Sequence, residues 1–216
     1  MPAPPMPPYD PPTGPLDIVH ADAALLVINK PAGLLSVPGK AAEHSDCLLA
    51  RVVDVFPEAR LVHRLDMDTS GLIVFARSAS AQRHLGLQFE RRHLEKTYTA
   101  RVAGPGLSET GEIDLPLIAD WPNRPLQMVC HATGKPALTR WEVLQSGAGE
   151  QRLALYPKTG RSHQLRVHCA ALGHPILGDR FYGGPPAPRL MLHASALRLR
   201  HPEGGAWQAF ECPPPF

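Results

Sequence analysis

The feature that most constrains the fold of this chain is a succession of short apolar runs, rich in branched residues and separated by turns that contain Gly and Pro. Runs of this kind are typical of β-strands. We expect strands at residues 16–20, 24–28, 72–76, 96–102, 111–117, 138–144, 152–156 and 190–199. Because few helices stand between consecutive strands, the pattern predicts an α+β fold. Its sheet should be mixed and mainly antiparallel, with flanking helices and loops.

Three segments are expected to form helices, at residues 45–55, 78–93 and 161–172. A hydroxyl side chain such as that of Ser45 can accept a hydrogen bond from the first turn of a helix. Gly173, with a proline two residues later, is typical of a helix end. The helices are therefore expected at the margins of the sheet, since they do not alternate with the strands.

The first 15 residues, MPAPPMPPYDPPTGP, contain almost no large apolar residue. We expect a disordered or polyproline-type tail there, and a single domain over residues 16–216. The tail lacks the basic start and apolar core of a signal peptide. No apolar run approaches the length of a membrane span, so we expect no membrane partner.

The four cysteines are far apart and form no CxxC pair. This spacing is typical of reduced thiols in a cytosolic protein and does not indicate a zinc site. The residues are Cys47, Cys130, Cys169 and Cys212.

The formal net charge of +2 conceals a segregation of charge along the chain. Residues 77–101 carry six basic and two acidic side chains, and residues 152–200 carry eight basic side chains against the single acid Asp179. A polyanion needs a local cationic surface rather than a high overall charge. The same segments fit ordinary solvated faces equally well, so charge alone leaves both possibilities open.

A polar turn, His63-Arg64-Leu65-Asp66-Met67-Asp68-Thr69-Ser70-Gly71, stands directly before an apolar strand. As the start of an EF-hand it fails, because the twelfth position is Arg77 and no helix precedes the loop. The run Asp66-Met67-Asp68-Thr69 fits the nucleophile motif of a magnesium-dependent phosphatase, although the apolar strand before it and the downstream acidic pair that this motif needs are missing. A turn in which Asp and Ser only cap backbone groups also fits.

A fourth interpretation is that one carboxylate of this turn acts on a glycosidic bond. Ordinary glycosidases need two carboxylates a few ångströms apart. Asp66 and Asp68 are two residues apart, so in an extended chain they face opposite sides. One carboxylate is sufficient only if the departing base is not released but is attached again.

A second polar segment is Thr159-Gly160-Arg161-Ser162-His163-Gln164-Leu165-Arg166-Val167-His168. Most of it fits an amphipathic helix with Leu165 in the core. Its two histidines are five apart, which is wrong for a helical metal pair. Arg161, expected where the turn enters the helix, suits a phosphate or a carboxylate.

These segments together resemble the RluA-type pseudouridine synthases. The resemblance rests on VHRLDMDTSG, Lys96-Thr97-Tyr98, GRSHQLRVH, GHPILG, Leu192-His193-Ala194 and the opening loop NKPAGLLSVPG, which come in the family's order. It covers nearly everything from residue 16 to the end. The likeness is to the short, single-domain members, without a separate S4-type RNA-binding module.

The resemblance implies an isomerase that converts uridine in RNA to pseudouridine. Asp66 would be the nucleophile or base that allows the N1–C1′ bond to break, after which the uracil is turned and joined through C5. Arg161 would pair with Asp66 and keep it ionised, since a nearby cation lowers the pKa of a carboxyl. Tyr98 would lie against the uracil ring, and Leu165 would form a wall of the pocket.

The resemblance further implies RNA contacts at four other positions. His63 and Arg64 would orient the loop or help to extrude the nucleotide, and Arg166 and His168 would bind RNA. The target uridine must leave its stack, which costs a few kcal/mol and favours loop uridines. No metal or organic cofactor is needed.

Likeness to the short members implies two targets, a 23S rRNA stem-loop and the anticodon stem-loop of some tRNAs. We expect a cytoplasmic monomer that needs no protein partner. Pro125-Leu126-Gln127-Met128 carries no lysine where relatives tend to be basic, so target choice could differ. The alternatives are a relative that binds RNA without catalysis and the Asp-x-Asp-x-Thr phosphatase.

Overall fold

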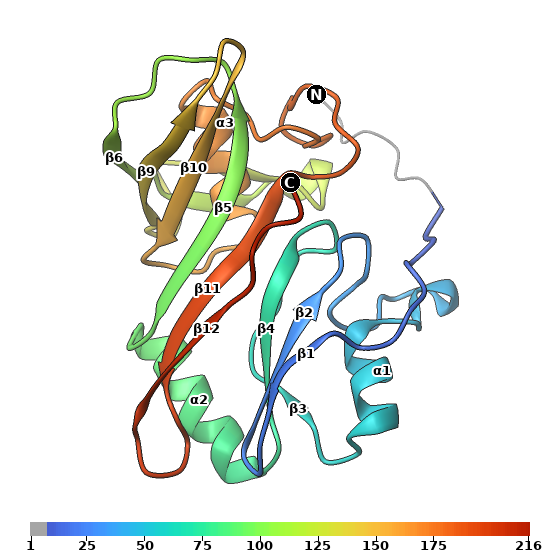
Figure 1. The fold of residues 1–216 in the computed structure, drawn as a ribbon. Helices are drawn as coiled ribbons and strands as arrows, with labels where there is room; N and C mark the ends of the chain where they lie inside the picture. The colour runs from blue at the N-terminus through green and yellow to red at the C-terminus, as the bar shows by residue number, and fades with distance from the viewer. Residues whose placement is uncertain (1–7) are drawn as a thin grey trace. The chain divides into compact units, whose positions relative to one another are not determined.

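The computed structural model describes residues 8–216, which divide into two compact units. We call residues 8–96 and 193–215 the Asp66 unit, and residues 97–192 with Phe216 the Arg161 unit. Figure 1 shows the strands and helices of both. Each unit has its own cluster of buried apolar side chains. The single domain expected over residues 16–216 therefore stays a prediction.

The sheet of the Asp66 unit begins with the two strands expected at residues 16–20 and 24–28, which pair with each other. Its strands, in spatial order, are β1 (Ile18–Ala21), β2 (Leu25–Lys30), β4 (Ser70–Ala76) and β11 (Leu192–Arg200). β12 (Trp207–Glu211) pairs with β11, and β3 (Arg60–Leu61) pairs with β4. All these pairs are antiparallel except β4 with β11, which is parallel. Every residue of β4 is buried, including residues 72–76, whose uninterrupted apolar sequence predicts this.

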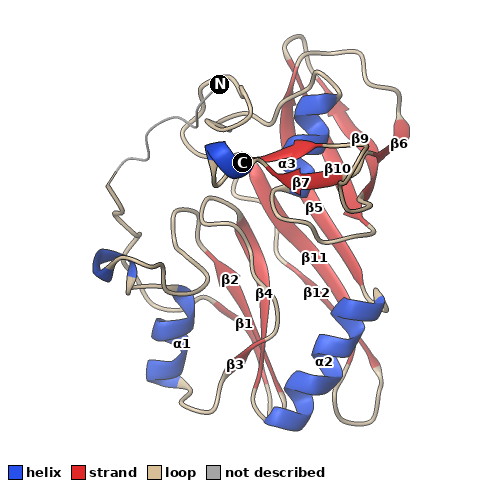
Figure 2. Cartoon of the chain, turned by 180° about the vertical axis from the view of Figure 1, so that it is seen from behind, coloured by secondary structure: helices blue, strands red, loops and turns tan. Residues whose placement is uncertain are grey.

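Two α-helices and a short 3₁₀ helix, η1 (Ala42–His44), complete this unit. α1 spans Leu48–Val55 and α2 spans Ala79–Arg91. Ser78 caps α2, because its side chain accepts a hydrogen bond from the backbone N–H of Ala81. The predicted cap of α1 is wrong: the Sγ of Cys47, not Ser45, accepts from the first turn. Figure 2 shows α2 running alongside the β11–β12 hairpin.

The Arg161 unit contains an antiparallel sheet covered by one α-helix. The strand order is β5 (Glu95–Ala103), β10 (Glu150–Pro157), β9 (Leu138–Ser146) and β6 (Thr110–Asp114). β7 (Leu117–Ala119) and β8 (Gln127–Val129) form a second sheet around η2 (Trp121–Asn123). α3 (Gln164–Ala171) contributes to the same core as β5 and β10.

The α+β class with a mixed, mainly antiparallel sheet is confirmed. Two of the differences from the expected boundaries concern the Arg161 unit. The strand predicted at residues 111–117 is two strands, β6 and β7. The third helix begins at Gln164, not at Arg161, because His163 adopts a left-handed conformation with φ 52° just before it.

Two residues of the proline-rich tail that the structure describes, Tyr9 and Pro12, make hydrogen bonds to later parts of the chain. Residues 1–7 lie outside the described residues, but the hydroxyl of Tyr9 donates to the carbonyl oxygen of Asp46 at 2.7 Å and accepts from the backbone of Leu35 at 3.1 Å. A guanidinium nitrogen of Arg51 donates to the carbonyl oxygen of Pro12 at 2.8 Å. Tyr9 and Pro12 are thus joined by hydrogen bonds to Asp46, Leu35 and Arg51. The expected disordered or polyproline-type tail over residues 1–15 stays a prediction.

All four cysteines are free. Within residues 8–216, no helix has both the length and the apolar character needed to cross a bilayer.

Candidate active site

The loop that carries Asp66 joins β3 to β4 and is fixed at its C-terminal end by the sheet. Ser70 and Gly71 lie in parallel register with His193 and Ala194 of β11. Gly71 has φ 109°, and a side chain there would overlap the backbone of Ala194. The Oγ of Ser70 lies 2.7 Å from Nδ1 of His193. The Thr-Ser-Gly and Leu-His-Ala motifs therefore lie next to each other, where β4 pairs with β11.

A buried lysine holds the same loop from the other side. The Nζ of Lys30, which is 0% exposed, donates to the carbonyl oxygens of Pro31, Leu34 and Met67 at 2.8, 2.7 and 2.9 Å. The backbone N–H of Gly33 also donates to the oxygen of Met67, at 2.9 Å. Buried ammonium groups persist only where such partners compensate for lost hydration. Lys30 therefore ties the opening loop to the loop of Asp66.

Ser36 adds a reciprocal pair of hydrogen bonds next to Asp66. Its Oγ donates to the carbonyl oxygen of Leu65 at 2.7 Å and accepts from the N–H of Leu65 at 3.1 Å. Both residues are buried. Neither Lys30 nor Ser36 was among the predicted site residues, although both stand in the opening loop NKPAGLLSVPG. Their role in holding the backbone of the Asp66 loop is seen only from their buried hydrogen bonds in the structure.

His63 connects the loop to β4 and α2. Its Nε2 accepts a hydrogen bond from the backbone of Val74 at 3.1 Å, and its ring stacks on Phe89 with centroids 4.4 Å apart. Burial, with a smaller contribution from Lys96, lowers the pKa of His63 to about 3. The ring is therefore neutral near pH 7 and can accept that bond. These contacts agree with a role in orienting the loop.

Asp66 opens a turn at the centre of this framework. The backbone N–H of Thr69 donates to the carbonyl oxygen of Asp66 at 3.2 Å. The side chain of Asp66 is half-buried, and Arg64 is exposed. The hydrogen bonds described above hold the backbone of this loop on both sides of Asp66. The backbone therefore forms a rigid support for the side chain of Asp66. A carboxylate held in this way can act as a nucleophile or a base.

Tyr98, Arg161 and Leu165 belong to the Arg161 unit. Tyr98 packs against the buried cluster that contains Leu165, which is 6% exposed. Arg161 lies in the turn before α3, where its N–H donates to the Oε1 of Gln164 at 3.0 Å and its Nε donates to the carbonyl oxygen of Pro136 at 3.1 Å. The predicted pairing of Arg161 with Asp66 stays a prediction, because the two residues belong to different units.

Arg166 and His168 are internal, and the RNA contact predicted for them stays a prediction. Arg166 is 2% exposed and donates through Nε and a terminal nitrogen to both oxygens of Asp179, each at 2.7 Å. His168 is 0% exposed, with Nδ1 2.9 Å from the hydroxyl of Thr139. Burial lowers its pKa, opposed by the carbonyl oxygen of Leu115.

α3 is therefore not the amphipathic helix that its sequence suggests. Its residues from Gln164 to Cys169 are all buried. The guanidinium of Arg166 also faces aromatic rings, 5.0 Å from the ring centre of Phe181. Burial and the nearby carboxylate of Asp179 raise the pKa of Cys169 to about 12. Polar residues are admitted to this interior because each has a partner within it.

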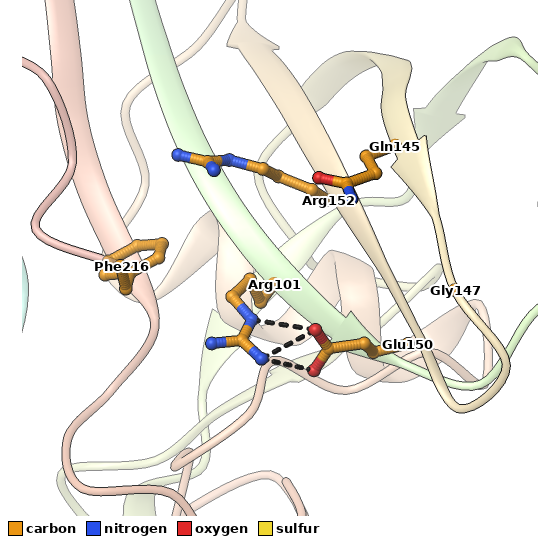
Figure 3. Close-up of a pocket in the computed structure, with 6 residues that line it drawn as sticks. All are labelled: Arg101, Gln145, Gly147, Glu150, Arg152 and Phe216. Atoms are coloured by element: carbon orange, nitrogen blue, oxygen red, sulfur yellow. Dashed lines mark hydrogen bonds and ion pairs between the residues drawn. The ribbon is translucent and has the colours of Figure 1, made fainter.

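The Arg161 unit also has a hollow of about 170 Å³ next to the β9–β10 turn (Figure 3). Two of its lining residues, Arg101 and Glu150, form an ion pair, with 2.6 Å between a guanidinium nitrogen and a carboxylate oxygen. It is lined by Arg101, Gln145, Gly147, Glu150, Arg152 and Phe216, and contains none of the predicted site residues. Among residues 8–216, no group of three or more His, Cys, Asp or Glu side chains is arranged to hold a metal ion.

Comparison with known proteins agrees with these motifs. Residues 24–171, more than half of the chain, match the model of the RNA pseudouridylate synthase family. The chain belongs to the RNA pseudouridylate synthase family. Members of this family are isomerases that convert uridine in RNA to pseudouridine, so the chain is a pseudouridine synthase and the phosphatase interpretation is set aside.

Relatives and solved structures extend the match over the whole chain. The dual-specificity RNA pseudouridine synthase RluA of Escherichia coli K12 is 52% identical over 214 residues, covering 96% of this chain and 98% of the relative. The protein of the same name from Yersinia pestis is 52% identical over 204 residues, covering 92% and 99%. The structure of human RNA Pseudouridylate Synthase Domain Containing 1 matches with a TM-score of 0.77 and 30% identity over 98% of this chain and 86% of that chain.

Proposed function

We propose that this pseudouridine synthase modifies uridines in both a 23S rRNA stem-loop and the anticodon stem-loop of tRNA, with Asp66 as its catalytic carboxylate. The support for two targets is the 52% identity to relatives named for dual specificity, which extends over 98% of their length. The support for Asp66 is the loop that carries it, whose backbone is held by buried Lys30 and Ser36 on one side and by β11 on the other.

In the proposed reaction Asp66 acts on an extruded uridine, either at the sugar or by removing a proton. The N1–C1′ bond breaks, the uracil remains bound and turns, and C5 bonds to C1′. The proton of C5 is released and N1 takes up a proton, so the product is an isomer of uridine. On the family resemblance, Arg161 pairs with Asp66 and Tyr98 lies against the uracil. Leu165 completes the apolar wall, and Arg64, the exposed member of the motif, helps to extrude the nucleotide.

Release of tritium from RNA carrying 5-tritiated uridine tests this proposal. Asp66→Asn should lower the rate by more than about 10³-fold, because the variant keeps the size of the side chain but removes the nucleophile. Asp68→Asn is the matched control: it changes the same group two residues away and should retain most of the activity. RNA binding by Asp66→Asn should persist.

Release at the wild-type rate by Asp66→Asn would refute its role. An rRNA fragment and a tRNA anticodon stem-loop are assayed separately, and release from only one of them would refute dual specificity. An absence of release from either by the wild-type protein, with binding intact, would favour the relative that binds RNA without catalysis. We further propose that the protein works as a monomer in the cytoplasm; sedimentation of the free protein tests the first point.

A further inference from the structure

The outer edge of the Asp66 unit carries an aromatic residue flanked by two arginines. Leu197 and Leu199 of β11 are buried, so Arg198 and Arg200 point to the opposite face of the strand. Trp207 of β12 lies directly across from Arg200 in the antiparallel pair. The guanidinium carbons of Arg198 and Arg200 lie 4.5 and 4.6 Å from its ring centre.

The C-terminal end of α2 adds to this cationic surface. Gln88 joins the helix to β11, because its side chain donates to the carbonyl oxygen of Arg200 and accepts from the N–H of Arg200, each at 2.8 Å. Arg91 and Arg92 follow one turn later, and both are exposed. Figures 1 and 2 both show α2 beside the β11–β12 hairpin. We call Arg91, Arg92, Arg198, Arg200 and Trp207 the Trp207 surface.

The structure thus joins two basic segments that are separated by about a hundred residues in the sequence. The pKa of Lys96 is lowered to about 8, mainly by burial and to a smaller extent by the nearby charge of Arg92. Glu95 is the acid that pairs with Arg198, with oxygens 3.3 and 3.4 Å from its guanidinium. At 64% exposure of the Glu95 side chain, such a pair is weak. The surface therefore keeps an excess of positive charge.

A purely structural explanation accounts for only part of this arrangement. Cations in the last turn of α2 offset the negative end of the helix dipole, which explains Arg91 and Arg92. The helix dipole does not explain the two arginines of β11. One of them, Arg200, also donates through Nη1 to the carbonyl oxygen of Gly205 at 3.0 Å, within the hairpin. Trp207 is 41% exposed and Arg198 is 47% exposed, so the cluster covers little apolar surface. Stacking on an indole instead limits the rotamers of the guanidiniums, and this lowers the entropic cost of binding an anion.

We propose that the Trp207 surface binds the phosphodiester backbone of the substrate RNA beyond the nucleotide that reacts. This inference rests on the proposed function, because it takes RNA as the substrate. Arg198 and Arg200, held against Trp207, contact phosphate oxygens, and Arg91 and Arg92 extend the cationic track along α2. The contacts are to phosphates, so they add affinity and orientation without reading the base sequence.

Equilibrium binding of a synthetic tRNA anticodon stem-loop at several NaCl concentrations tests the proposal. The double variant Arg198→Gln/Arg200→Gln should raise Kd by roughly 10-fold or more and reduce the slope of log Kd against log salt by about 1–2, since counterion release follows the number of phosphate contacts. The matched control Arg60→Gln/Arg140→Gln removes two exposed arginines elsewhere and should leave both quantities unchanged.

A gain of affinity provides a second test that misfolding cannot imitate. Glu95→Gln removes the carboxylate next to Arg198 and should lower Kd by roughly 2–3-fold at low salt. Unchanged Kd and slope in the arginine double variant, an equal change in the control, or no gain in Glu95→Gln would each overturn the proposal.

The two proposals fail in different ways. Tritium release by the wild-type protein together with binding that ignores Arg198 and Arg200 would refute only the Trp207 surface. Binding that depends on them, without tritium release, would refute only the proposed catalytic function.

Discussion

The Asp66 loop and the α3 segment carry similarly polar sequences, but their hydrogen bonds are placed differently. Around Asp66, Lys30 and Ser36 bond to main-chain oxygens, including those of Met67 and Leu65. Around α3, the polar side chains themselves are the buried partners, as in the pair of Arg166 with Asp179. Polar motifs can therefore either direct a side chain from a rigid backbone or stabilise an interior, and changes in the two regions should have different effects.

The largest effect is expected from Asp179→Asn in the Arg161 unit. This substitution leaves the guanidinium of Arg166 buried without its carboxylate, which should lower the free energy of unfolding by about 3–5 kcal/mol. Urea unfolding measures the loss. The control Glu112→Gln breaks the exposed pair with Arg140 and should cost only ~0–1 kcal/mol. Similar losses in both variants would show that the buried pair has no special weight.

Lys30→Met should have the next largest effect, in the Asp66 unit. It leaves the carbonyl oxygens of Pro31 and Leu34 without the ammonium, so we expect a loss of about 2–3 kcal/mol in the free energy of unfolding. Tritium release at saturating RNA should also fall, because the loop of Asp66 is no longer tied at Met67. Lys40→Met serves as the control, because Lys40 is exposed and directly follows the opening loop that contains Lys30. Full activity in Lys30→Met would contradict the role of the backbone framework.

Ser36→Ala sharpens the comparison at smaller scale. It removes both hydrogen bonds to Leu65, beside Asp66, and should lower the free energy of unfolding by about 1–2 kcal/mol. Ser108→Ala removes an exposed bond to the carbonyl oxygen of Thr110 and should change it by less than about 0.5 kcal/mol. If the two variants unfold alike in urea, burial of the Ser36 bonds does not matter.

The smallest effect is the pH dependence contributed by His63. Its folded pKa is about 3, below the unfolded value near ~6.5, so the unfolded chain binds the extra proton. The contribution of His63 is therefore complete above pH ~6.5 and is lost as the pH falls below that value. Because the ring remains partly exposed, we expect a loss of about 1 kcal/mol between pH 7 and pH 5.

The variant His63→Phe isolates this contribution. It keeps a ring beside Phe89 but cannot titrate, so its free energy of unfolding should fall less steeply over the same pH range. Parallel pH profiles for the wild-type protein and the variant would show that His63 does not report on this loop.

The sequence alone determined the elements whose cause is local. Alternating and continuous apolar runs predict strands because one or both faces of a strand are buried, and the fully buried β4 is the clearest case. Ser78 predicts the start of α2 because a cap depends only on the first turn. The ordered motifs likewise identify the family, since chemistry requires particular residue types at particular positions.

Only the tertiary structure decided where the polar side chains went. Arg166 and His168 could not be separated by sequence from exposed RNA-binding residues, because their partners Asp179 and Thr139 are 13 and 29 positions away. Lys30 could not be identified as buried, because its acceptors include Met67, 37 positions along the chain. A hydrogen bond to a residue far along the chain offsets the cost of burying a charge. The residues next to Lys30 or Arg166 in the sequence do not indicate that such a partner exists.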